Sequence, residues 1–213
     1  MSERREARTV IRIYHAPRTR SVRVIWLCEE LAIPYEVVTI DFSREYRASD
    51  EWRAMHPQGK VPVMEDGDIT IFESCAMIQY LLDRYGGGRL QPQAGSEAAA
   101  HYQQWCWFAE SSFARPLGDM IHHSRLRPEH ERIPGVVEDA RLRAEPCLAA
   151  TDQHLVNRNY LVGDSFSGAD IIMAWTLFLA KMLELFDEES APNAWRYLAN
   201  LEARPAYQSA LQA

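Results

Sequence analysis

The chain has 213 residues, of which 47% are apolar and 25% are charged, and this ordinary globular composition excludes a disordered or fibrous protein. Thirty acidic residues against 23 basic ones give a formal net charge of −7. Because the basic residues are scattered along the chain, a nucleic-acid-binding surface is not expected. The expected partner is a protein or a small molecule.

The four cysteines, Cys28, Cys75, Cys106 and Cys147, form no C-x-x-C pair and have no metal-ligand spacing. Neither a disulfide framework nor a metal site is therefore expected. The polar start of the chain lacks the apolar stretch of a signal peptide. The longest apolar run, Ile171–Ala180, is far shorter than the roughly 20 residues that span a bilayer. These features predict a soluble protein of the cytoplasm.

The first elements in chain order form a strand, a helix and a strand. Val10–Tyr14 reads as a short strand, and the apolar residues that follow Ser21 recur at helical spacing until Pro34 ends the pattern. Tyr35–Ile40 is β-branched and strand-like. Ser43–Met55 then has the spacing of one modest helix. The strand, helix and strand over residues 10–40 have the size of a βαβ unit, which predicts a parallel strand pair.

Two more strands and a helix complete this region. Val61–Met64 and Ile69–Phe72 flank a turn that contains Asp-Gly, which is typical of a hairpin. Glu73–Tyr85 has one apolar helical face and ends at three glycines. The first 85 residues therefore predict the order β-α-β-α-β-β-α.

The pattern changes at residues 89–96, which read R-L-Q-P-Q-A-G-S and are the expected linker. Everything after them is helical in pattern. The sequence therefore predicts a first domain over residues 9–88 and an all-helical domain over residues 97–213. The expected helices are Ala98–His123, Pro134–Val156, Gly168–Phe186 and two shorter ones that begin at Pro192 and Pro205.

This order of elements resembles the cytosolic glutathione transferases, in which a thioredoxin-like α/β domain precedes an all-α domain. Three motifs carry the resemblance. Residues 56–62, H-P-Q-G-K-V-P, are similar to the family's N-P-x-G-x-V-P with His56 in place of Asn. Residues 73–78 resemble the E-S-x-A-I start of the family's third helix. Residues 163–171, G-D-S-F-S-G-A-D-I, resemble a motif of its helical domain.

The resemblance implies that glutathione binds at two of these motifs. The family has a cis peptide bond before the motif's proline, so Val61–Pro62 is expected to be cis. The backbone of Val61 is expected to pair with the cysteinyl part of glutathione, and Lys60 and Pro62 are expected to belong to the same binding site. An edge-strand proline without a ligand is the alternative.

Glu73 and Ser74 are expected to bind the γ-glutamyl end, which carries an ammonium and a carboxylate. Ser74 opens a helix, whose first N–H groups favour an anion, and Glu73 can accept the ammonium. In the alternative, Ser74 only caps the helix. Arg47 is the candidate for the glycyl carboxylate of glutathione.

The residue that activates the thiol is expected in the loop between the first strand and helix. The candidates are Thr19, then Tyr14 and Ser21. Thr19 precedes the helix and is expected to have a free side chain, Ser21 is expected to cap the helix, and Tyr14 lies in the strand. Arg18, Arg20 and Arg23 add positive charge that favours a thiolate. The loop holds no cysteine, which argues against a mixed-disulfide mechanism.

The helix Ala98–His123 carries several aromatic residues, and in the family it lines the dimer interface and the electrophile pocket. Trp107, Ser111 and Arg115 have i, i+4, i+8 spacing and are the candidates for that pocket. His122 and His123 read as a solvated helix end. A homodimer is expected.

Ser167 and Asp170 form the S-x-x-D pattern of a helix-capping box, so Asp170 is expected to be structural rather than catalytic. The resemblance implies an enzyme that activates the glutathione thiol for attack on small electrophiles or peroxides. The alternative is an interaction or regulatory protein of the same fold with reduced catalysis. A glutathione-dependent isomerase is disfavoured because its Ser-Ser-Cys loop is absent.

Overall fold

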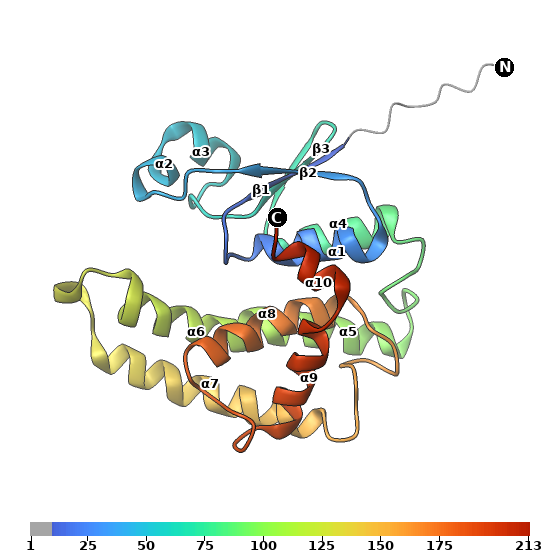
Figure 1. The fold of residues 1–213 in the computed structure, drawn as a ribbon, viewed down its shortest axis with the longest axis vertical. Coiled ribbons are helices and arrows are strands. Elements are labelled where there is room, and N and C mark those ends of the chain that lie inside the picture. Colours follow the sequence, from blue (N-terminus) through green and yellow to red (C-terminus); the bar gives the residue numbers. More distant parts are fainter. Residues whose placement is uncertain (1–9) are drawn as a thin grey trace. The chain divides into compact units, whose positions relative to one another are not determined.

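A computed structural model describes residues 10–213, which form two compact units (Figure 1). Unit 1 contains the chain up to Gly87 together with Pro205–Ala213, and unit 2 contains Gly88–Arg204. The last nine residues therefore do not belong to the helical domain in which the sequence pattern placed them. They join unit 1 because a tertiary contact, described below, holds them there.

Unit 1 is built on a four-stranded mixed sheet with the order β2-β1-β3-β4. The central β1 pairs in parallel with β2 and antiparallel with β3, and β3 pairs antiparallel with β4. This agrees with the predicted βαβ unit and hairpin. The strands are Ile11–His15 (β1), Tyr35–Thr39 (β2), Val63–Asp66 (β3) and Ile69–Phe72 (β4).

Three helices pack together beside this sheet. α1 (Ser21–Leu31) and α4 (Ser74–Tyr85) lie on the same face of the sheet in Figure 1 and contact each other. α10 (Pro205–Ala210) packs on α1, where the rings of Trp26 and Tyr207 meet edge to face with centroids 4.9 Å apart. This contact buries both rings and fixes the end of the chain to unit 1.

The connection from β2 to β3 contains two short helices, α2 (Arg44–Ala48) and α3 (Asp50–Met55), so the prediction of one helix over Ser43–Met55 is wrong. Ser49 separates them because its backbone is extended, with ψ at 151°, and its hydroxyl accepts a hydrogen bond from the N–H of Trp52. An N-cap of this kind begins a new helix. Trp52 is buried in a small core with Val63 of β3.

Unit 2 begins with a long helical stretch that changes its winding twice. α5 (Glu97–Trp107) runs into a π-helical segment, residues 108–113, followed by α6 (Ala114–Ile121) and a second π-helical segment, residues 122–126. A π-helix has i→i+5 hydrogen bonds and a wider turn than an α-helix. The predicted single helix Ala98–His123 is therefore interrupted, and side-chain spacing across residues 108–113 does not follow the 3.6-residue period.

The rest of unit 2 consists of α7 (Pro134–His154), α8 (Gly168–Met182) and α9 (Pro192–Glu202). The predicted capping box at the start of α8 is confirmed. The buried carboxylate of Asp170 accepts hydrogen bonds from the N–H groups of Leu161 and Ser167 and from the hydroxyls of Ser167 and Tyr197, at 2.8–2.9 Å. Burial raises the pKa of Asp170 and these hydrogen bonds oppose that shift. Asp170 is thus fully used in holding the start of α8.

Candidate functional site

The start of α4 carries the first group of candidate residues. Ser74 is the first residue of the helix and is buried, and its Oγ accepts a hydrogen bond from the Arg23 guanidinium of α1 at 3.2 Å. Glu73 precedes it with a φ of +74°, is exposed, and makes no side-chain capping bond to the helix. The side chain of Glu73 thus leaves the first N–H groups of α4 uncapped, and its own carboxylate faces solvent.

The segment before β3 follows a tight turn. His56 is buried, and its Nδ1 accepts a hydrogen bond from the backbone N–H of Gln58 at 3.3 Å, as an Asn side chain does in an Asx turn. Burial lowers the pKa of His56, which keeps this nitrogen available as an acceptor. At Gly59, with a φ of +62°, a Cβ atom would lie 2.1 Å from the carbonyl oxygen of Arg47. His56 therefore builds the turn in place of Asn.

The Val61–Pro62 bond is cis, as expected. Val61 lies before the first residue of β3, and the turn and loop hydrogen bonds among residues 10–213 include none to its backbone. Lys60 is exposed, and Glu73 and Lys60 both act electrostatically on His56, which places these charges around the same turn. Val61 and the start of α4 are thus parts of one region of unit 1.

Arg47 interacts with its own helix start. Its Nε donates to the carbonyl oxygens of Phe42 at 3.1 Å and Ser43 at 3.3 Å, and the guanidinium stacks on the Phe42 ring at 4.3 Å. These contacts hold the guanidinium at the N-terminal end of α2. The role of Arg47 as the cation for the glycyl carboxylate stays a prediction.

Two predictions about the loop after β1 are wrong in their local geometry. Thr19 does not have a free side chain, because its Oγ1 donates to the carbonyl oxygen of Ala16 at 2.8 Å and lies 2.7 Å from the Oγ of Ser21. Ser21 does not cap α1 but is its first residue, and its Oγ lies 2.8 Å from the Nδ1 of His15. His15, whose role the sequence did not suggest, thus ends a line of hydrogen-bonding groups.

Tyr14 is occupied elsewhere. Its hydroxyl donates to the Glu65 carboxylate on β3 at 3.0 Å, and its ring packs against Trp52. Burial and the neighbouring carboxylate raise the pKa of Tyr14. A phenol that already donates to a carboxylate is a poor donor to a second anion.

The three candidates for the electrophile pocket lie before, within and after the first π-helical segment of unit 2. Trp107 is the last residue of α5 and is 67% exposed. The Ser111 hydroxyl donates to the Trp107 carbonyl oxygen at 2.8 Å, and Arg115 pairs with Asp119 at 3.4 Å. The π-helical winding between them means that their spacing no longer defines one face.

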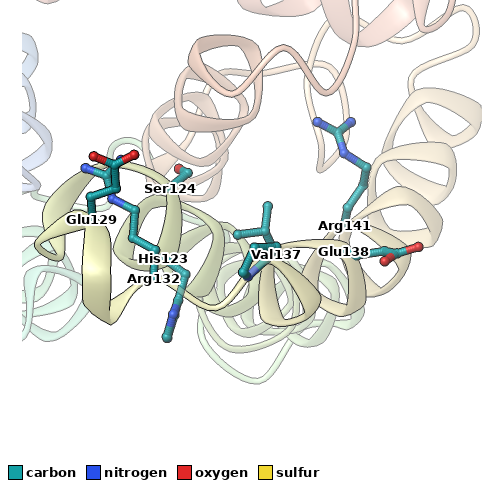
Figure 2. A pocket seen from close by; sticks show the side chains of 8 residues that line it. His123, Ser124, Glu129, Arg132, Val137, Glu138 and Arg141 are labelled. Carbon is teal, nitrogen blue, oxygen red and sulfur yellow. The ribbon is translucent and has the colours of Figure 1, made fainter.

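A separate hollow of about 570 Å³ lies in unit 2 where the second π-helical segment meets α7 (Figure 2). His123 lines it, is half-buried, and its Nδ1 accepts a hydrogen bond from the N–H of Ile133 at 3.2 Å. Figure 2 shows Glu138 and Arg141 leaving α7 in different directions. The charged groups of this hollow do not converge on one point.

Within residues 10–213, no cluster of three or more His, Cys, Asp or Glu side chains has the arrangement of a metal site. In the same part of the chain, every helix is too short or too polar to cross a bilayer.

Comparison with known proteins gives a consistent result. The family model described as the glutathione S-transferase N-terminal domain matches residues 9–83, and the C-terminal domain model matches residues 118–205. Glutathione S-transferase 3 of Schizosaccharomyces pombe is 26% identical over 207 residues, covering 92% of this chain and 85% of that protein. Glutathione S-transferase 1 of Triticum aestivum is 28% identical over 209 residues, covering 91% and 90%.

Solved structures agree at the level of the fold. Glutathione transferase URE2P6 from Phanerochaete chrysosporium, in complex with oxidized glutathione, is similar with a TM-score of 0.84 and 26% identity over 96% of both chains. Glutathione transferase URE2P8 from the same organism, with oxidized glutathione, has a TM-score of 0.86 at 24% identity and covers 97% of this chain and 96% of that one.

Proposed function

Because the chain belongs to the glutathione S-transferase family, we propose that unit 1 binds glutathione and activates its thiol for attack on small electrophiles or peroxides. The observation that carries this proposal is the start of α4. The exposed Glu73 carboxylate and the uncapped N–H groups beside Ser74 are complementary to the ammonium and the carboxylate of the γ-glutamyl end. Arg23 adds a buried positive charge behind Ser74.

The second support is the backbone of Val61. Its position outside the strand ladder suits pairing with the cysteinyl residue of glutathione in the manner of an added strand. Lys60, Val61 and Pro62 would hold the middle of the tripeptide, and Arg47 would hold its glycyl carboxylate. Contacts at both ends and in the middle of the tripeptide would restrict the position of the cysteinyl sulfur.

Thr19 is the proposed donor to the sulfur. A free thiol with a pKa near 8.5 is only a few per cent ionised at pH 7, and each unit of depression needs about 1.4 kcal/mol of differential stabilisation. One hydroxyl donor and nearby positive charge supply about one or two units. That range gives a useful fraction of thiolate at neutral pH.

A calorimetric titration with glutathione tests the binding, and a panel of aryl halides, epoxides and hydroperoxides tests the reaction. We expect saturable binding and turnover of at least one class. The absence of any heat of binding and of any turnover with a correctly folded sample would contradict the proposal.

The second candidate function is an interaction or regulatory protein that binds glutathione with little catalysis. It is favoured by one observation, the engagement of the Thr19 hydroxyl with the Ala16 carbonyl oxygen. The ultraviolet absorbance of the bound thiolate separates the two functions. A depressed thiol pKa supports the enzyme, and an unshifted pKa with intact binding supports the regulatory protein.

We also propose a homodimer in the cytoplasm, with the helices over residues 97–126 supplying much of the interface. The family resemblance supports this, together with the aromatic residues of this stretch, a residue type that is enriched at interfaces. Trp107, Ser111 and Arg115 remain the proposed contacts of the electrophile. Sedimentation at micromolar concentration is the test, and a single 24.5 kDa species would contradict the dimer.

A further inference from the structure

Three side chains and one carbonyl form a continuous line of hydrogen bonds between the end of β1 and the start of α1. The Nδ1 of His15 lies 2.8 Å from the Oγ of Ser21, and that Oγ lies 2.7 Å from the Oγ1 of Thr19. Thr19 in turn reaches the carbonyl oxygen of Ala16 at 2.8 Å. His15 and Ser21 are buried, whereas Thr19 is half-buried, so the line runs from the interior toward the surface.

Counting protons fixes the direction of this line. A carbonyl oxygen only accepts, so Thr19 gives its one hydroxyl proton to Ala16. The contact between the two hydroxyls then needs the proton of Ser21, because Thr19 has no second one. Ser21 therefore accepts from His15, whose Nδ1 must carry a hydrogen. The Oγ of Ser21 also lies 3.4 Å from the carbonyl oxygen of Ala16, but this is the longest of the four contacts. Any other order leaves one of the three shorter contacts without a proton.

The other ring nitrogen of His15 agrees with this assignment. Its Nε2 is buried and has no hydrogen-bond partner among residues 10–213. A buried N–H without an acceptor costs more than a bare ring nitrogen, so the single proton of the neutral ring belongs on Nδ1. Burial lowers the pKa of His15 and keeps the ring neutral.

We propose that His15 is a positioning residue that orients the Thr19 hydroxyl toward the glutathione sulfur by forcing Ser21 to donate to Thr19. Because the proton of Ser21 makes the bond between the two hydroxyls, the proton of Thr19 stays available for another acceptor. A thiolate beside the loop then accepts the hydrogen bond from Thr19 in place of the Ala16 carbonyl oxygen. The bonds from His15 to Ser21 and from Ser21 to Thr19 remain and strengthen the bond to the thiolate. This inference rests on the proposed function, because it concerns how the thiol is activated.

The first test measures the tautomer of His15 in the unmodified protein and uses one variant only to assign the signal. Nitrogen-15 NMR of the seven histidines distinguishes the two neutral tautomers, and the His15→Asn spectrum identifies the signal of His15. We expect the Nδ1–H tautomer at pH 7.5. A signal typical of Nε2–H would overturn the proposal, whether or not the protein binds glutathione.

The second test measures the pKa of the bound glutathione thiol by thiolate absorbance. His15→Leu removes the donor at similar volume, whereas the amide nitrogen of His15→Asn stands near the position of Nδ1. We expect His15→Leu to raise the thiol pKa by about 0.5 to 1 unit, a three- to tenfold loss of thiolate below that pKa. His15→Asn should restore most of it. Equal shifts in the two variants would show a packing role only.

A double variant tests whether His15 acts through Thr19. In a Thr19→Val background, His15→Leu should cause no further rise in the thiol pKa, since the hydroxyl that it orients is gone. The same rise in both backgrounds would overturn the proposal. Calorimetry on the unmodified protein separates a failure of the proposed function from a failure of the inference about His15. A failure to bind glutathione counts against the proposed function and leaves the tautomer result intact.

Discussion

The Arg23 guanidinium donates a hydrogen bond to the Oγ of Ser74 at 3.2 Å, joining two helices whose residues are 51 positions apart. Because the hydroxyl oxygen accepts this bond, the hydroxyl proton of Ser74 remains for an acceptor beyond the start of α4. The arrangement makes Ser74 a donor rather than a helix cap. We therefore expect Ser74 to contribute more to the binding of an anionic ligand than to the stability of its helix.

Ser74→Ala should weaken glutathione binding by about 1 to 3 kcal/mol, the range for losing a hydrogen bond to a charged group. Isothermal titration calorimetry measures this directly. Ser96→Ala is the matched control, because Ser96 caps α5 in unit 2 and accepts from the N–H of Ala99. The control should leave the affinity unchanged, and equal losses in both variants would count against the binding role of Ser74.

Thr19→Val should raise the pKa of the bound thiol, because it removes the donor and keeps the side-chain shape. Tyr14→Phe is its control and should leave that pKa in place, since the Tyr14 hydroxyl donates to Glu65. Thiolate absorbance as a function of pH measures both. If only Tyr14→Phe moves the titration, the donor is the tyrosine. If neither does and Arg18 or Arg20 substitutions do, positive charge stabilises the thiolate.

The free energy of unfolding should fall as the pH drops from about 7 to 5. Burial lowers the pKa of His15 and of His56 below the ordinary value, so the unfolded chain takes up protons near pH 6.5 before the folded chain does. More protons on the unfolded state mean that stability rises with pH. Urea unfolding at several pH values measures how steeply the free energy of unfolding depends on pH. This pH dependence should be smaller in the double variant His15→Asn/His56→Asn, and an unchanged pH dependence would contradict this account.

Asp170→Ala should cost about 3 kcal/mol or more of unfolding free energy, because it leaves buried N–H and hydroxyl groups of unit 2 without their acceptor. Asp187→Ala is the matched control: that carboxylate also accepts several hydrogen bonds, from Ser190 and Glu189, but in an exposed turn. The control should lose far less, because water can replace the carboxylate as the acceptor in an exposed turn. Similar losses in both variants would show that burial is not the deciding factor.

Much of the fold follows from local sequence patterns. Short apolar runs and an Asp-Gly turn signal predicted four strands in the right order, and the S-x-x-D pattern predicted the capping box of α8. The break at Ser49 and the π-helical segment over residues 108–113 were missed, because hydrophobic spacing does not report a single extended residue or a wider turn. Both depend on backbone angles, and the same spacing of apolar residues is compatible with more than one set of angles.

The candidate site was predictable only in part. The motifs around Val61 and Ser74 place residues in one region of unit 1, but the hydrogen bonds among His15, Thr19 and Ser21 depend on tertiary geometry. Nothing in the sequence pairs a strand-end histidine with a serine six residues later. Arg23 was seen as local positive charge, and its bond to Ser74 needed the packing of α1 against α4.

The packing of α10 on α1 has a consequence for how the protein is made. The ribosome delivers the sheet and α1 early, but the helix that packs on Trp26 is translated only after all of unit 2. The first unit therefore reaches its final form only after α10 has left the exit tunnel. Until then Trp26 lacks the ring of Tyr207, and a chain cut at residue 204 would never gain that contact.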